Sequence, residues 1–340
     1  MTQDKFAGAQ PVPPGQLDAS ANFATANREP AAPQLSAELG ITNSAPKPRA
    51  SRMPQKTPAF QAMHAGRYRR QELIRTIERL TGRQLICYVG GIQTSISRDD
   101  VLMLVDLLHN VRPNEKLDLM LHTPGGDMDA AEKIVSMIRN VVGNEELRII
   151  IPDFAKSSGT LIALGADVIV MSDSSELGPI DPQIVLNDGQ GNQIPTPIQS
   201  YLDAFAQYSG VLAANPDDVV AHIMMQKFDP ARLKLFEAAR LRARTFAESQ
   251  LQRGMFRSPK TGNITGIAGE LLNTGKWLSH GQMIGHAAAR ELGLTVEYLA
   301  PHDELWEAYW QLYCYQRFEI KDKQKLFESN YASLPVEDGD

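Results

Sequence analysis

The chain has 340 residues, 43% of them hydrophobic and 22% charged, so it is long enough for one large folded domain or two ordinary ones. A formal net charge of −6 and a pI near 5.7 argue against a nucleic-acid surface as the main partner. Its two cysteines, Cys87 and Cys314, form neither a metal-ligand spacing nor a disulfide framework, which indicates a reducing compartment. We see no signal peptide and no apolar run of about 20 residues that would cross a bilayer, so we expect a cytoplasmic protein.

Residues 1–60 are rich in Ala, Pro, Gln, Ser and Asn. Such a composition buries too little apolar surface to offset the entropy lost on ordering. We therefore predict a disordered N-terminal tail.

From about Met63 onward, apolar runs of strand type alternate with amphipathic helical segments. Strands separated by helices of ten or more residues predict parallel β-α-β units, and hence an α/β sheet covered on both faces. The predicted helices are 67–82, 99–111, 128–141 and 157–166, and the predicted strands are 83–90, 116–123, 147–152 and 167–173.

The pattern loosens after Gln183. We expect a β-hairpin around Asp188-Gly189, helices at 198–210 and 230–256, and a helix that begins near Gly281 and leads into a short strand. The aromatic-rich helix at 302–319 has more large apolar surface than a solvent-facing helix should, so it packs on the body or on another subunit. We therefore divide the folded part into a main domain, 61–300, and a C-terminal helix and tail, 301–340.

Two unusual turns lie where predicted strands end: Pro124-Gly125-Gly126, and Lys156-Ser157-Ser158-Gly159. Parallel α/β sheets collect functional groups at the carboxyl ends of their strands. If the two turns lie side by side, the backbone N–H groups of Gly126 and Ser158 could both donate to one substrate oxygen next to the Ser157 hydroxyl. Acyl transfer needs such a pair of donors, because they stabilise the oxyanion that forms. Each turn alone also fits a purely structural role, as a tight turn or as a helix cap.

The segment "LHTPGGDMDAAEKI", followed by "AKSSGTLIALGADVIVMSDSSELGPIDPQ", resembles the ClpP/crotonase-fold serine peptidases. More narrowly it is similar to the SDH ("serine dehydrogenase") proteinase family, relatives of signal peptide peptidase SppA. The resemblance spans about residues 85–299 and is strongest over 121–183. It implies a ClpP/crotonase-like fold, a serine peptidase acting on peptides or proteins without a cofactor or metal, and assembly as a homo-oligomer.

The resemblance also assigns roles within the two turns. The family carries its nucleophile in an S-x-G triplet, which here falls on Ser157, with Ser158 as the alternative. The oxyanion hole would use the Gly125-Gly126 turn and the N–H of Ser158.

The proton acceptor is left open among several residues. His280 is the natural general base for a serine, and Asp181 could orient that base, accept the proton itself, or only cap a turn. Lys156 precedes the serine, but we expect its side chain to point away from the hydroxyl as a solvated surface lysine. No lysine occurs between Ser157 and Lys227, which excludes a lysine close downstream.

Weaker candidates for the base are His286, His122 and a residue from another subunit. One position along a strand decides whether His122 faces the core or the cleft.

Other enzyme classes find little support in the motifs. The sequence has no G-x-x-x-x-G-K-[ST] motif for an ATPase motor, no H-E-x-x-H or Cys/His cluster for zinc, and no G-x-G-x-x-G opening a helix. Two alternatives to a peptidase stay open. One is a crotonase-like acyl-CoA enzyme that uses the same oxyanion hole, although we see no basic cluster for the CoA phosphates; the other is a non-catalytic scaffold.

Overall fold

The computed structural model describes residues 56–187, 193–257 and 262–338, within one compact unit, Lys56–Asp340. Most of the predicted tail, residues 1–55, and the predicted turn at Asp188-Gly189 lie outside the described residues. The boundary expected at residue 60 falls inside a short helix, α1 (Pro58–Met63).

The core is a seven-stranded sheet in the order β11-β10-β1-β2-β3-β5-β9. Strands β1, β2, β3, β5 and β9 are parallel neighbours, with β9 at one edge, whereas β10 runs antiparallel to β1 and β11 antiparallel to β10. This mainly parallel α/β sheet confirms the predicted fold class. The strands are β1 (Gln84–Gly90), β2 (Leu117–His122), β3 (Leu147–Ile150), β5 (Val168–Met171), β9 (Val296–Tyr298), β10 (Gln324–Ser329) and β11 (Ser333–Glu337).

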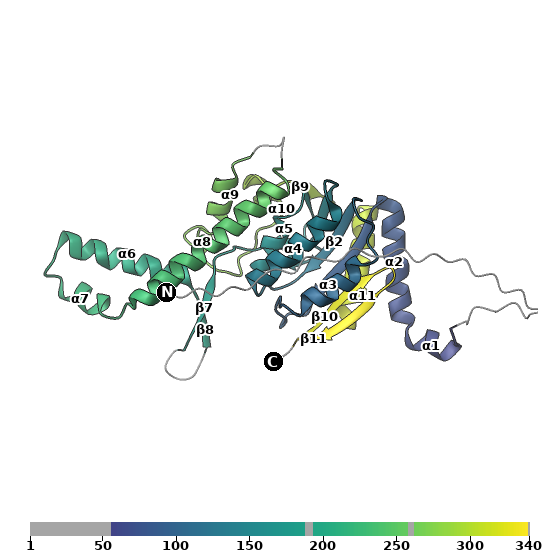
Figure 1. Cartoon of the computed structure of the whole chain (residues 1–340), viewed down its shortest axis with the longest axis horizontal. Helices are drawn as coiled ribbons and strands as arrows, with labels where there is room; N and C mark the ends of the chain where they lie inside the picture. Colours follow the sequence, from purple (N-terminus) through teal and green to yellow (C-terminus); the bar gives the residue numbers. More distant parts are fainter. Residues whose placement is uncertain (1–55, 188–192, 258–261, 339–340) are drawn as a thin grey trace, which may run out of the picture. The chain divides into compact units, whose positions relative to one another are not determined.

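The sheet is covered on both faces, and for this reason its strands read as continuous apolar runs (Figure 1). One face packs against α3 (Asp100–Leu108), α4 (Met128–Val142), α5 (Ser158–Ala163), α8 (Pro230–Arg253) and α9 (Ile264–Leu271). The other face packs against α2 (Ala65–Thr81) and α11 (Glu304–Glu319).

The segment after residue 300 belongs to this core. Trp306, Tyr309 and Tyr313 of α11 are buried against the sheet, so the aromatic helix packs on the body of its own chain. The following residues supply β10 and β11, which nothing in the sequence pattern predicted.

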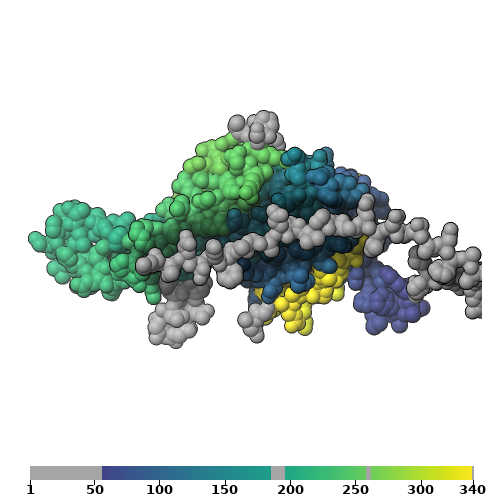
Figure 2. Space-filling model, viewed as in Figure 1, coloured from purple at the N-terminus to yellow at the C-terminus, as the bar shows by residue number. Residues whose placement is uncertain are grey.

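A helical arm lies apart from the sheet and consists of α6 (Ile198–Ala214), α7 (Val219–Met225) and the first half of α8 (Figures 1 and 2). Helix α6 packs on α7 and on α8. The strands of the predicted hairpin, β7 (Gln183–Asn187) and β8 (Gln193–Pro197), pair with each other and lead into α6.

The region before β9 differs from its prediction. The helix expected near Gly281 is α10 (His286–Glu291), and residues 278–285 form a loop with one isolated bridge, at Ile284. Two short strands, β4 (Phe154–Ala155) and β6 (Glu176–Leu177), pair in parallel beside this loop.

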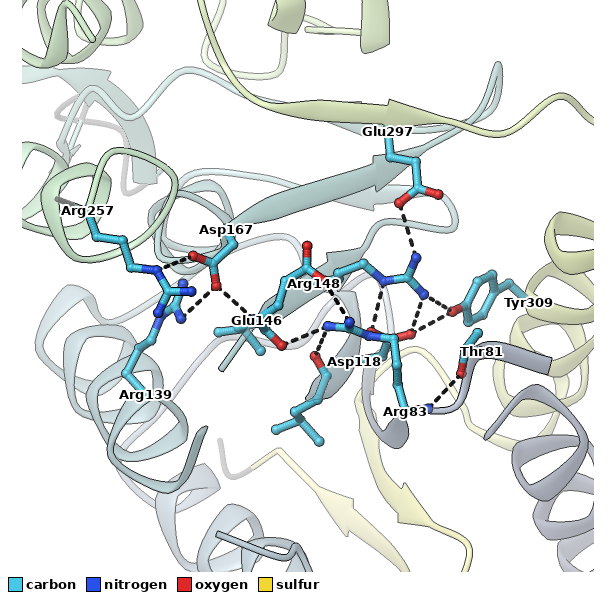
Figure 3. A network of polar contacts seen from close by, with 12 residues as sticks. Thr81, Arg83, Asp118, Arg139, Glu146, Arg148, Asp167, Arg257, Glu297 and Tyr309 are labelled. Atoms are coloured by element: carbon cyan, nitrogen blue, oxygen red, sulfur yellow. Dashed lines mark hydrogen bonds and ion pairs between the residues drawn. The ribbon is translucent and has the colours of Figure 1, made fainter. Parts of the chain in front are cut away.

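Buried charges lie at the amino ends of the parallel strands (Figure 3). Asp118 on β2 accepts hydrogen bonds from Arg148 (3.0 and 2.7 Å) and from the Tyr309 hydroxyl (2.8 Å), and it also pairs with Arg83. Burial, followed by the charge of Asp118, raises the pKa of Tyr309, so this hydroxyl stays protonated and donates.

A second buried carboxylate, Asp167, lies just before β5 in the same region. It binds Arg139 and Arg257, each at 2.9 Å, and the backbone N–H of Leu147 at 2.8 Å (Figure 3). The contacts of Asp118 and those of Asp167 therefore connect the beginnings of neighbouring strands.

Candidate active site

Ser157 lies in a strained turn between β4 and α5. Its φ of 52° is positive, which among the described non-glycine residues it shares only with Asn114, and such a conformation costs about 1–3 kcal/mol. The backbone of Lys156 fixes this turn, because its N–H donates to Thr123 (3.0 Å) and its carbonyl accepts from Gly159 (2.7 Å). Within the described part of the chain, the Ser157 hydroxyl makes no hydrogen bond.

The glycine turn lies directly beside the serine turn. An isolated parallel bridge joins Thr123 to Ala155, and a Cβ added to Gly125 would lie 2.8 Å from Cβ of Ser157. Gly125 and Gly126 have φ values of 108° and 146°, a region that only glycine adopts readily. The two bends that the sequence separates by about thirty residues therefore form one edge.

Two backbone donors are free at this edge. The N–H groups of Gly126 and Ser158 donate to no acceptor in the described residues. Ser158 begins α5, and the first N–H groups of a helix have no intrahelical partner. The Ser158 hydroxyl is engaged instead, donating to the Gly126 carbonyl at 2.7 Å.

His280 and Asp181, which lie 99 residues apart in the sequence, meet near the turns. Nδ1 of His280 lies 2.9 Å from Oδ1 of Asp181. A carboxylate only accepts, so Nδ1 carries the proton of this bond and Nε2 is the ring atom left for another partner. Oδ2 of Asp181 is buried and has no hydrogen-bond partner among the described residues.

One pocket of about 380 Å³ contains most of these groups. Its lining includes Ser157, Ser158, Gly126 and His280. The other lining residues are mainly apolar: Pro124, Met128, Leu161, Ile180, Pro182 and Gln183. Of these residues only Pro124 was singled out from the sequence, as part of the glycine turn, because an apolar side chain near a motif is indistinguishable from an ordinary core residue.

Lys156 does not behave as the solvated surface lysine that we expected. Its side chain is 12% exposed and its Nζ forms an ion pair with Glu176 at 3.0 Å. The amine also lies 3.2–3.4 Å from three backbone carbonyl oxygens. The expectation was wrong because the loop around His280, far away in the sequence, folds over this side chain.

The two weaker histidine candidates lie outside the pocket. His122 is fully buried on the α11 side of the sheet, where its Nδ1 is 2.8 Å from the Gly90 carbonyl and its ring contacts Tyr313. His286 begins α10, with Nε2 3.7 Å from Asp173.

The described residues contain neither a cluster of metal-binding side chains nor a membrane-spanning helix. They include no group of three or more His, Cys, Asp or Glu side chains that could hold a metal ion. No helix among them has both the length and the apolar character needed to span a membrane. The cytoplasmic location stays a prediction.

Part of the chain matches a known protein family. A family model described as "ClpP-like SDH-type serine proteinase" matches residues 57–199, less than half of the 340 residues. The matched range contains both turns and Asp181 but ends before His280. It confirms the resemblance seen in the motifs.

Two uncharacterized proteins of Methanocaldococcus jannaschii are similar to the chain. The first is 30% identical over 201 residues, which are 58% of this chain and 60% of that protein. The second is 34% identical over 131 residues, or 35% of this chain and 44% of that protein. The chain thus spans less than two thirds of either relative.

Solved structures of two variants of a 1510-N membrane-bound stomatin-specific protease, one in complex with a substrate peptide, are also similar. Their sequence identities are 19% and 20%, and their TM-scores are 0.26 and 0.25. The similarities cover 64% and 66% of this chain and 99% and 97% of theirs. TM-scores this low say nothing about the site.

Proposed function

Because residues 57–199 match the family model of the ClpP-like SDH-type serine proteinases, we propose that this protein is a serine hydrolase that cleaves peptide bonds, with Ser157 as its nucleophile. One observation supports this most strongly. The Ser157 hydroxyl, which has no hydrogen-bond partner among the described residues, lies in the same pocket as His280 and the N–H groups of Gly126 and Ser158.

In the proposed reaction, Oγ of Ser157 attacks the carbonyl carbon while Nε2 of His280 takes its proton. Asp181, bonded to Nδ1 at 2.9 Å, orients the ring and stabilises the imidazolium that forms. The N–H groups of Gly126 and Ser158 bind the oxyanion, each contributing about 3–4 kcal/mol in the transition state. His280 then protonates the leaving amine as the C–N bond breaks, and water hydrolyses the acyl-enzyme.

The contacts of Ser158 and Lys156 support this distribution of roles. The Ser158 hydroxyl already donates a hydrogen bond to the Gly126 carbonyl, so this contact holds its oxygen at the glycine turn. Nζ of Lys156 donates to the Glu176 carboxylate and to three backbone carbonyls, so its hydrogens are directed to groups other than the Ser157 hydroxyl.

Labelling by a fluorophosphonate probe tests the nucleophile. We expect Ser157→Ala to abolish labelling, Ser158→Ala to be labelled more slowly than wild type, and Ser209→Ala, on the helical arm, to react like wild type. Labelling that persists in Ser157→Ala would move the nucleophile elsewhere. A folded wild-type protein that no such probe labels would favour a non-catalytic scaffold.

We also propose that the chain assembles as a homo-oligomer through its helical arm. The arm exposes apolar side chains that a monomer would leave in water: Val219, Val220, Ile223, Leu235 and Leu241. Light scattering at micromolar concentration should give a mass above the 37.5 kDa of one chain. A monomeric mass would contradict this assignment.

A further inference from the structure

Lys156 links the serine turn to the loop that carries His280. We propose that Lys156 is a positioning residue, which holds this loop in place so that the His280 ring faces Ser157. The inference rests on the serine hydrolase function proposed above. It assigns to Lys156 neither nucleophilic nor proton-transfer chemistry.

The contacts of the ammonium group show the link directly. Nζ lies 3.3 Å from the Gly281 carbonyl oxygen and 3.4 Å from that of Gln282, the two residues that follow His280. It also lies 3.2 Å from the Leu177 carbonyl oxygen on β6. Because an ammonium group only donates, these carbonyls and one charged partner, the Glu176 carboxylate at 3.0 Å, are its acceptors.

The side-chain stem of Lys156 packs closely against the backbone. A Cβ added to Gly178 would lie 2.8 Å from Cδ of Lys156, so the stem runs closely over this glycine. The backbone of Lys156 is fixed by its hydrogen bonds to Thr123 and Gly159. Lys156 therefore connects the serine turn directly to the loop.

The loop has few other restraints. At its beginning, the Trp277 indole N–H donates to the Glu270 carbonyl at 2.7 Å, and at its end Ile284 pairs with Leu177. Between these anchors, the hydrogen bonds to other described residues are those of His280 to Asp181 and of the two carbonyls to Lys156. Charge-assisted hydrogen bonds are about twice as strong as neutral ones, so the ammonium is the main restraint on the loop backbone.

Lys156→Met tests the role, because it keeps an aliphatic stem over Gly178 and removes only the ammonium. A shift of about 1 Å in a catalytic group costs roughly 100-fold in rate, so we expect kcat, and the rate of fluorophosphonate labelling, to fall by about that factor. KM should change by no more than about threefold, because the groups that contact the substrate remain. Hydrogen–deuterium exchange of residues 278–285 should become faster.

Lys276→Met is the matched control. Lys276 lies just before the same loop, is 42% exposed, and pairs with the Glu270 carboxylate at 2.7 Å without contacting the carbonyls of Gly281 or Gln282. Its labelling rate should equal that of wild type.

Restoring the charge distinguishes positioning from a general effect on folding. In a Cys314→Ser background, Lys156→Cys should be slow, and alkylation with 2-bromoethylamine, which attaches an aminoethyl group to the new sulfur and releases bromide, should recover most of the rate. Cys87 should stay unmodified, because complete burial raises the pKa of its thiol and shields it.

The possible results separate this inference from the proposed function. A Lys156→Met protein with unchanged loop exchange, or with wild-type labelling, would overturn the role of Lys156. Faster loop exchange in a protein whose wild type is never labelled would support the link between turn and loop and overturn the hydrolase function instead.

Discussion

Asp118, at the amino ends of the parallel strands, and Ser157 and Asp181, at the carboxyl ends, differ in how their polar atoms are bonded. At the amino ends, both oxygens of Asp118 are bonded within a buried network (Figure 3). At the carboxyl ends, Ser157 has a positive φ and an unpaired hydroxyl, and Oδ2 of Asp181 has no partner among the described residues. Saturated polar groups stabilise a fold, whereas strained and unpaired ones cost free energy and are typical of sites kept for function.

The largest expected effect on stability lies at the amino ends. Asp118→Ala would leave Arg83 and Arg148 buried without their common carboxylate, and breaking a buried pair in this way costs about 3–5 kcal/mol. The free energy of unfolding, measured by urea denaturation, should fall by that amount.

Ser157→Ala provides the contrast within the same assay. It removes a hydroxyl that makes no hydrogen bond within the described residues, so its free energy of unfolding should stay within about 1 kcal/mol of wild type. If Ser157→Ala destabilised as much as Asp118→Ala, the proposed division between the two ends would be wrong.

A smaller effect is expected from Gly125→Ala. The added methyl would lie 2.8 Å from Cβ of Ser157 and 2.9 Å from the Lys156 carbonyl oxygen, on a residue whose φ is 108°. We expect a loss of about 1–3 kcal/mol in the free energy of unfolding, and much slower fluorophosphonate labelling as the turns separate.

Gly210→Ala is the control for that substitution. Gly210 lies within α6 with nothing inside 4 Å of the added methyl, so alanine should stabilise by about 0.5–1 kcal/mol. If the two substitutions changed the free energy of unfolding equally, the glycine turn would not depend on a backbone conformation that favours glycine.

The smallest effect concerns Asp153, which follows β3. Partial burial works to raise the pKa of Asp153, but contacts with His122 and Tyr313 outweigh it, so the pKa lies below its usual 3.8. Because the folded-state pKa is the lower one, the stabilisation is complete above about pH 5 and is lost as the pH falls through the folded-state value.

Asp153→Asn should therefore be slightly less stable than wild type at pH 6, and the difference should shrink below about pH 4. We expect at most about 1 kcal/mol, since the side chain is 39% exposed and its interactions are screened. Urea denaturation from pH 3 to 6 measures the difference, and a gap that widened with acid would contradict the lowered pKa.

The sequence by itself determined the parallel strands, their helices and the two turns of the candidate site. Hydrophobic periodicity and glycine or proline at turns depend on neighbouring residues, so they can be recognised locally. It also singled out His280 and Asp181 separately, as residues of suitable chemistry.

Only the tertiary structure decided which of these residues meet. The 2.9 Å contact of His280 with Asp181, and the enclosure of Lys156 by the loop after His280, join segments about 100 or more residues apart. The same holds for β10, which pairs with β1 although it was expected to be tail. Burial and pairing are properties of packing between distant segments, and no local pattern encodes which segments will pack together.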